Sequence, residues 1–256
     1  MANSECVHAG DPGASSSEFN GLLVSPEVVP SEKVRWFDQL PPAPAAYGLP
    51  AVRQDCVQYD QPLVEVGGVG ICDAYCVLGI LPSRRMMVRS EVAKRLVRAS
   101  RLLPDMFGLT VLDGWRSVDE QQSQVAHYGD GAADEGFVAP VSDDGCRPPH
   151  TTGGTVDLTL SWNGEPLALG TDFDSFDDEA ASDAFEEPGA DVRVRLLRRG
   201  FAYAMSAVGF VNYELEWWHW SYGDDVWAHA MGRPALYEIV GETHVERSRS
   251  AGLCLD

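Results

Sequence analysis

Positive charge is scarce in this sequence of 256 residues. Its 39 acidic residues outnumber its 19 basic ones, and the formal net charge is −20. Only Lys33 and Lys94 are lysines. Nucleic acids and anionic membrane surfaces are bound through basic faces. The composition therefore argues against both of them as the main partner.

Long apolar runs are also missing. No stretch approaches the roughly 20 residues that a membrane-spanning helix requires. Residues 1–5 have neither the basic start nor the apolar core of a secretory signal. The cysteines are scattered, with only Cys72 and Cys76 close together, so no second pair completes a zinc knuckle. These features favour a cytoplasmic protein with reduced thiols.

What remains is an ordinary globular composition, 45% apolar, in a chain long enough to bury a full core. Residues 1–20 are rich in small and polar types and predict a disordered tail. Residues 241–256 are polar and predict a frayed C-terminal tail. Between them, residues 21–240 contain no linker and no internal repeat, so we expect one domain. The prolines of residues 22–50 exclude a long helix and predict an extended surface segment.

The apolar periodicity predicts helices mixed with strands. Helices are expected over 90–103 with Ser90 as N-cap, over 118–127 with Ser117 as N-cap, and over 192–208. Strands are expected over 62–66, 108–113, 156–160 and, as one piece, 213–220, with a hairpin turn at Asn163-Gly164. Loops are expected over 129–146 and 172–191. This order of elements indicates the α+β class.

The stretch over residues 213–220 concentrates three tryptophans beside Glu216 and His219. Tryptophan rings exclude water and lower the local dielectric, which strengthens the binding of a charge or a metal. Glu216 and His219 are three positions apart, so a flat strand would point them to opposite faces. To act together they need a twist, a bulge or a strand end.

A second cluster contains His150 and Asp157. Gly153 and Gly154 lie between them and allow a tight turn, so that both side chains could face one ion. Two histidines and an aspartate with one free glutamate make the residue set of a hydrolytic zinc site. Each of the two clusters is a weak signal by itself, and together they become informative.

Four stretches together resemble the zinc-dependent D-alanyl-D-alanine dipeptidases of vancomycin resistance and cell-wall recycling. Residues 148–157 are similar to the family's metal motif S-x-H-x-x-G-x-A-x-D, and residues 216–219 match its E-W-W-H. Residues 113–116 resemble its D-G-Y-R, and residues 169–174 resemble its M-G-x-x-F-D. The four motifs follow the family's order within residues 105–222, which makes the combined match specific.

The resemblance implies one zinc ion per chain, with His150, Asp157 and His219 as ligands. It also implies an α+β domain with a central antiparallel sheet flanked by helices, covering residues 21–240.

The resemblance assigns three further roles. Glu216 would be the general base and proton shuttle, and Arg116 would stabilise the oxyanion of the tetrahedral intermediate. Asp174 would pair with the free ammonium of the substrate, which implies a small dipeptide as the partner. From the residues alone, Arg116 could instead simply pair with Asp113, and Asp174 could belong to an exposed acidic loop.

Two positions depart from the family pattern. Pro148 stands where the family has a serine that helps to hold the substrate, and Thr155 stands where it has an alanine. Neither position is a metal ligand or the base, so we expect hydrolysis to be retained. The alternative is a zinc carboxypeptidase or amide hydrolase acting on another small peptide or a specialised metabolite. A third interpretation is a non-catalytic peptide-binding protein. No motif indicates an oligomeric state.

Overall fold

The computed structural model describes residues 21–129, 138–141 and 145–241. The predicted tail over 1–20 lies outside the described residues, as do residues 242–256 of the predicted C-terminal tail. Part of the loop predicted over 129–146 lies outside them as well.

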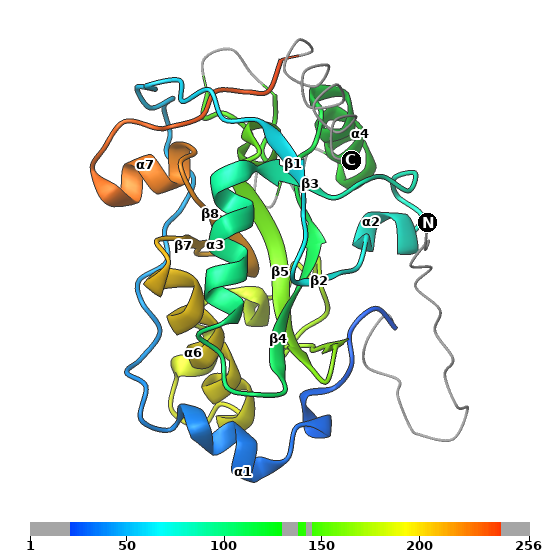
Figure 1. The fold of residues 1–256 in the computed structure, drawn as a ribbon, viewed down its shortest axis with the longest axis vertical. Helices are drawn as coiled ribbons and strands as arrows, with labels where there is room; N and C mark the ends of the chain where they lie inside the picture. The colour runs from blue at the N-terminus through cyan, green and yellow to red at the C-terminus, as the bar shows by residue number, and fades with distance from the viewer. Residues whose placement is uncertain (1–20, 130–137, 142–144, 242–256) are drawn as a thin grey trace, which may run out of the picture.

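A central sheet organises the described part of the chain (Figure 1). Its strands follow the order β2-β4-β5-β8-β7, and the short β6 pairs with β5. The strand bounds are Gly70–Ile71 (β2), Phe107–Asp113 (β4), Thr155–Trp162 (β5), Glu165–Pro166 (β6), Val211–Tyr213 (β7) and Glu216–Ser221 (β8). A separate two-stranded sheet pairs β1 (Leu63–Glu65) with β3 (Met87–Arg89).

The α+β fold with a central sheet flanked by helices is confirmed, and the sheet is mixed. Every pair in the central sheet is antiparallel except β2 with β4, which is parallel. The chain between β2 and β4 contains two helices and crosses over before it returns to the sheet. Such a crossover produces a parallel neighbour, whereas a short turn produces an antiparallel one.

Helices cover the sheet. Figure 1 shows α3 beside α6, and the two contact each other and the sheet through β4 and β5 respectively. The α-helices are Ser31–Val34 (α1), Ala74–Val77 (α2), Ser90–Ser100 (α3), Val118–Tyr128 (α4), Val192–Ala207 (α6) and Asp225–Met231 (α7). The 3-10 turns are Pro26–Val28 (η1), Arg35–Phe37 (η2), Pro149–Thr152 (η3), Asp178–Ala180 (η4) and Ala184–Glu186 (η5).

Two of the predicted helix starts can be compared directly with the structure. Ser117 caps α4, and its side chain and that of Glu120 form the reciprocal bonds of a capping box, as predicted. Ser90 as the cap of α3 is wrong, because Ser90 is the first helical residue and Arg89 is the N-cap. The backbone N–H of Ser90 donates to the carbonyl of Pro62 at 3.0 Å. A neighbouring segment thus satisfies the helix end, and no capping side chain is needed.

The extended segment predicted over residues 22–50 is only partly correct. No long helix forms there, but the described chain makes the short turns η1, α1 and η2. Pro26 opens η1 and Pro30 is the N-cap of α1. Proline is tolerated in the first turn of a helix, where its missing N–H needs no partner, so the prolines start short turns here as well as preventing long ones.

The single strand predicted over 213–220 is wrong. The chain forms a hairpin in which β7 ends at Tyr213 and β8 begins at Glu216. Glu214 lies exposed in the turn, where its backbone N–H donates to the carbonyl of Tyr47. Aromatic residues on both sides of the turn make the two strands look continuous in the sequence. The other predicted turn, at Asn163-Gly164, is confirmed, with φ of 53° and 90°.

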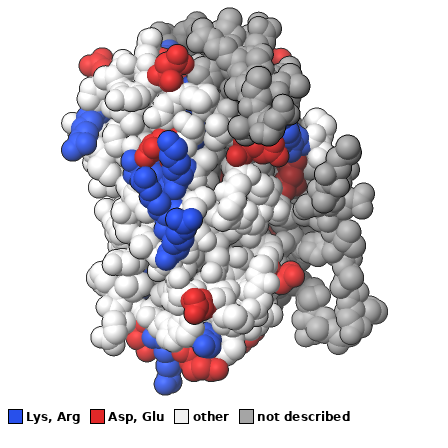
Figure 2. Space-filling model, in the orientation of Figure 1, with Lys and Arg blue, Asp and Glu red and all other residues white. Residues whose placement is uncertain are grey.

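The surface carries few basic groups. Figure 2 shows a cluster of Lys and Arg side chains over α3, where Lys94 and Arg98 are exposed. Among residues 21–129, 138–141 and 145–241, no helix is both long and apolar enough to span a membrane. The cysteines within these ranges, Cys56, Cys72, Cys76 and Cys146, are free thiols.

Candidate metal centre

His150 is placed by a tight turn ahead of β5. It lies in η3, which ends at Gly153 with φ of 72°, a backbone conformation that glycine adopts without strain. A Cβ at Gly153 would lie 2.7 Å from Leu63 Cδ2, so the end of that buried side chain would have to move. The Nδ1–H of His150 donates to the carbonyl of Gly114 at 2.7 Å. In a neutral imidazole this bond places the proton on Nδ1 and leaves the lone pair on Nε2.

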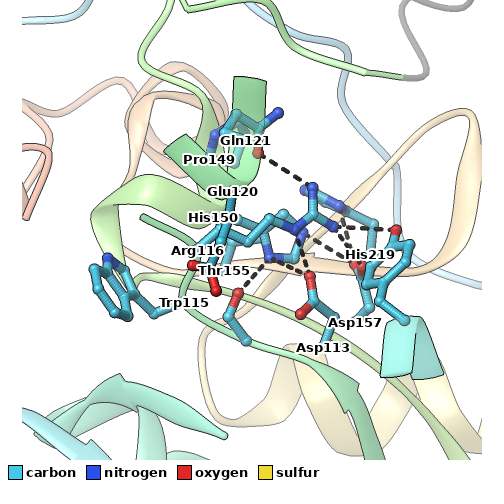
Figure 3. Close-up of polar contacts among 12 residues, drawn as sticks. Asp113, Trp115, Arg116, Glu120, Gln121, Pro149, His150, Thr155, Asp157 and His219 are labelled. Atoms are coloured by element: carbon cyan, nitrogen blue, oxygen red, sulfur yellow. Dashed lines mark hydrogen bonds and ion pairs between the residues drawn. The ribbon is translucent and has the colours of Figure 1, made fainter. Parts of the chain in front are cut away.

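Asp157 and His219 meet across two neighbouring strands. They are directly paired residues in the antiparallel β5–β8 ladder, so their side chains stand on the same face of the sheet. His219 Nδ1 lies 3.1 Å from Asp157 Oδ1. His150 Nε2 lies 3.3 Å from the same oxygen. Figure 3 shows the three side chains converging.

Glu216 reaches the same side as His219 because β8 is irregular. Asn212 pairs with Trp220, but the next residue of β7, Tyr213, pairs with Glu216, so three residues of β8 bulge between these pairs. A bulge redirects the side chains that flank it. Glu216 Oε2 consequently lies 3.4 Å from His219 Nδ1. The sequence required a bulge or a strand end to bring Glu216 and His219 together. Both are present, because β8 is bulged and Glu216 is its first residue.

The bulge is stabilised from β7. The side-chain amide of Asn212 donates to the carbonyl of Glu216 at 3.1 Å and to that of His219 at 2.8 Å. One buried amide therefore spans the irregular segment and holds Glu216 and His219 at a set separation. This role of Asn212 has no signal in the sequence.

Burial shapes the electrostatics of these groups. Burial raises the pKa of Glu216, with His219 opposing the rise. Burial would also raise the pKa of Asp157, but His150 and His219 hold it well below its usual range. Burial lowers the pKa of His219, and Asp157 and Glu216 more than reverse this and raise it to about 10. A buried pair of carboxylates beside two histidines is a site that favours a cation.

The three predicted ligands fit a metal ion. One ligand atom from each of His150, Asp157 and His219 lies within 4.8 Å of the other two. Within the described residues, His150 Nε2, Asp157 Oδ1 and His219 Nε2 are buried and make no hydrogen bond of good geometry. Buried polar atoms without partners are rare in folded proteins, and binding of an ion would satisfy all three of these atoms. Two imidazoles and a carboxylate are a donor set that suits zinc.

Arg116 is a fixed cation at the edge of this group. Its Nε donates to Asp113 Oδ2 at 2.6 Å, and its Nη2 lies 3.5 Å from Asp157 Oδ2. Gln121 and Tyr75 accept from the other guanidinium nitrogens, each at 3.2 Å. The pairing with Asp113 that the sequence left open is present, and it orients Arg116 toward the site. Burial lowers the pKa of Arg116, but Asp113 more than reverses this, so the guanidinium stays charged.

Asp174 is directed into the site, whereas Asp177 and Asp178 of the same acidic loop are exposed. Its φ of 66° is left-handed, which is uncommon for a residue other than glycine. The hydroxyls of Tyr75, at 3.2 Å, and of Tyr128 donate to its two carboxylate oxygens. Burial raises the pKa of Asp174 to about 7, against the hydrogen bond from Tyr128. Asp174 is thus a directed group of the site and not part of an exposed surface.

All the predicted site residues line one small cavity of about 30 Å³. These residues are Arg116, His150, Asp157, Asp174, Glu216 and His219. Tyr75, Gln121 and Gln124 line it too, and no motif in the sequence singles them out. A larger cavity of about 440 Å³ lies elsewhere, against Trp217, Trp220 and Arg198, and contains none of the six.

The two departures from the family motif lie outside the cavity. Pro148 is buried as the N-cap of η3, and its carbonyl accepts from the N–H and the hydroxyl of Thr151. The hydroxyl of Thr155 donates to Asp224, the N-cap of α7. Thr155 therefore links β5 to α7, and the ligand set keeps its place in the presence of both departures.

Known proteins are similar to this chain in sequence. The model of the Peptidase_M15 family, described as D-ala-D-ala dipeptidase, matches residues 77–236. A D-alanyl-D-alanine dipeptidase of Synechocystis is 26% identical over 176 residues, which cover 56% of this chain and 71% of that protein. Another, from Streptomyces coelicolor, is 32% identical over 159 residues, which cover 54% of this chain and 74% of that protein.

Among solved structures, that of the LdcB LD-carboxypeptidase aligns with a TM-score of 0.37 and 19% identity. The alignment covers 74% of this chain and 79% of that one.

Proposed function

Because the chain belongs to the D-Ala-D-Ala dipeptidase family of metallopeptidases, we propose that it hydrolyses D-Ala-D-Ala or a closely related dipeptide in the cavity described above. The observation that supports this most strongly is the convergence of all six candidate residues on that one cavity. They come from the segment after β4, from η3 and β5, from the loop that holds Asp174 and from β8, and they span residues 116 to 219 of the chain.

His150, Asp157 and His219 would hold one zinc ion per chain. The support is their three buried ligand atoms without hydrogen-bond partners and the tautomer that Gly114 imposes on His150. Zinc held there would supply the Lewis acidity that polarises a peptide carbonyl and acidifies water.

Glu216 would act as the general base. It would take a proton from the attacking water and deliver it to the leaving amino group. Burial raises its pKa, which makes it a stronger base than an exposed glutamate. Its Oε2 lies 3.4 Å from His219 Nδ1, so Glu216 would lie next to the proposed metal ligands and would not be a ligand itself.

Arg116 and Asp174 would position and stabilise the substrate from two sides. Arg116 is held in place by Asp113 and presents a permanent positive charge to the oxyanion. Asp174, aligned by Tyr75 and Tyr128, would accept the free ammonium of a dipeptide. A carboxylate held in this position favours a substrate with a free N-terminus.

The experiment uses purified, zinc-loaded protein and three substrates: D-Ala-D-Ala, L-Ala-L-Ala and N-acetyl-D-Ala-D-Ala. We expect free D-alanine from the first and little from the other two, with one zinc per chain by elemental analysis. Cleavage of the acetylated peptide at the same rate would contradict the role of Asp174. It would instead favour a zinc carboxypeptidase or amide hydrolase.

We further propose that residues 21–240 form the catalytic domain in the cytoplasm. One hydrophobic cluster extends from Leu22 to Tyr237, and the described cysteines are free thiols. Limited proteolysis should leave a resistant, active fragment with these bounds, and cell fractionation tests the location.

A further inference from the structure

Arg198 is a buried cation with no carboxylate partner in the part of the chain that the structure describes. It lies on the buried face of α6 and is only 4% exposed. Arginine is almost never buried to this extent without an ion pair. No carboxylate among the described residues lies within ion-pair distance of it, and burial lowers its pKa to about 9, with a partial offset from Asp183. Such a costly arrangement calls for a specific role.

The guanidinium binds backbone carbonyls at both ends of one loop. Its Nε donates to Leu169 at 2.7 Å, its Nη1 to Ala181 at 2.6 Å and its Nη2 to Glu179 at 2.7 Å. These carbonyls enclose residues 170–178. The planar guanidinium holds its three nitrogens in a fixed arrangement, so each carbonyl accepts from a different nitrogen, whereas a lysine offers one nitrogen on a flexible stem.

The enclosed segment carries Asp174 in its left-handed conformation. A strained backbone of this kind persists only where its surroundings fix it. Thr171, near the start of the segment, accepts a hydrogen bond from Trp217 Nε1 at 2.9 Å. The Cζ of Arg198 also lies 5.6 Å from the centre of the Trp217 ring and 4.6 Å from the centre of the Phe185 ring. The loop, Arg198 and the residue that follows Glu216 thus form one packed unit.

We propose that Arg198 is a positioning residue that holds the loop of residues 170–178 so that Asp174 faces the substrate ammonium. It acts through the three carbonyls and touches no reacting atom. The inference rests on the proposed role of Asp174 in substrate binding. It assigns the specificity for a free N-terminus to a residue that lies outside the catalytic cavity.

The test compares Arg198→Lys and Arg198→Gln with the wild type, as full-length zinc-loaded proteins. Arg195→Lys, on the same helix but outside these contacts, is the matched control. Hydrogen exchange of the backbone amides of 170–180 should accelerate about tenfold in the Arg198 variants, because the loop opens locally. Exchange in β5 and β8 should stay unchanged.

Kinetics supply the second measurement. For D-Ala-D-Ala we expect the Arg198 variants to raise KM about tenfold with kcat nearly constant, since substrate placement is weakened and the chemistry is not. In these variants the ratio of kcat/KM for the free dipeptide to kcat/KM for the N-acetylated dipeptide should decrease. The control should match the wild type in both respects.

Unchanged exchange over 170–180 would overturn the proposal, as would equal losses on free and acetylated substrate. Variants that fail to fold, or that lose protection throughout the sheet, would show a general structural role and would also overturn it. If the wild type itself does not prefer the free dipeptide, the proposed role of Asp174 fails instead. The exchange measurement then still decides whether Arg198 holds the loop.

Discussion

The variant Asp174→Asn tests two effects of this carboxylate separately: the loss of folding stability caused by its burial, and its contribution to substrate binding. In the folded protein the pKa of Asp174 is about 7, whereas an unfolded aspartate titrates near 3.8. Between these values the folded protein keeps a proton that the unfolded chain has lost, so the free energy of unfolding falls as the pH rises through this window. Asparagine has the same shape and no charge. It should remove this loss while still accepting a hydrogen bond from Tyr75.

The size of the effect follows from the shift. Three pKa units at about 1.36 kcal/mol each give an upper limit of about 4 kcal/mol above neutral pH. Because Asp174 is only partly buried, we take about half of that, roughly 2 kcal/mol. For a domain of this size, such a change raises the melting temperature by about 4–8 °C. Well below pH 4 both proteins are uncharged at this position, and their stabilities should converge.

The assay is thermal unfolding of the zinc-loaded wild type and Asp174→Asn near pH 5 and pH 8. The variant should be the more stable at pH 8, by a margin that shrinks at pH 5. The same variant should raise KM for D-Ala-D-Ala by about 10-fold to 100-fold, because it loses a hydrogen bond between charged groups. Acetylated substrate should be unaffected. A stability difference that does not depend on pH, or an unchanged KM, would refute this account of Asp174.

Four further substitutions test the rest of the site and the fold. Glu216→Gln should lower kcat by about 10²–10⁴ through loss of the base while zinc content stays constant, and full activity would exclude the mechanism. His150→Ala should lose zinc by elemental analysis and lose turnover, whereas the exposed control His229→Ala should keep both. Arg116→Lys should lower kcat by about 10²–10³ with a small change in KM, and a change in KM alone would contradict a role at the oxyanion. Ser117→Ala should remove the capping box of α4 at about 1 kcal/mol, seen as a melting temperature lower by about 2–4 °C, and an unchanged melting curve would contradict this.

The residues of the site could be predicted where chemistry and local spacing specify them. His150 and Asp157 lie on either side of a glycine turn. Glu216 and His219 lie in a motif that follows the motif of Arg116 along the chain, in the same order as in the family. The family and fold that these motifs imply are confirmed. The local cap at Ser117 could also be predicted, because a capping box is a short-range pattern.

Contacts between distant segments could not be predicted in this way. The pairing of Asp157 with His219 depends on strand register, and the approach of Tyr75 and Tyr128 to Asp174 depends on how α2 and α4 pack. The error at Ser90 has the same origin, since Pro62 supplies the partner that a local cap would otherwise provide.

The bulge in β8 makes the two-residue gap between Glu216 and His219 a fixed length. Inserting or deleting one residue there would exchange the two faces of the strand, which would carry Glu216 away from the three candidate ligands. Substitutions at Trp217 and Trp218 leave this count intact, whereas any change in length does not. The spacing of the motif is therefore set by the backbone of the bulge, and the two hydrogen bonds of Asn212 hold that spacing.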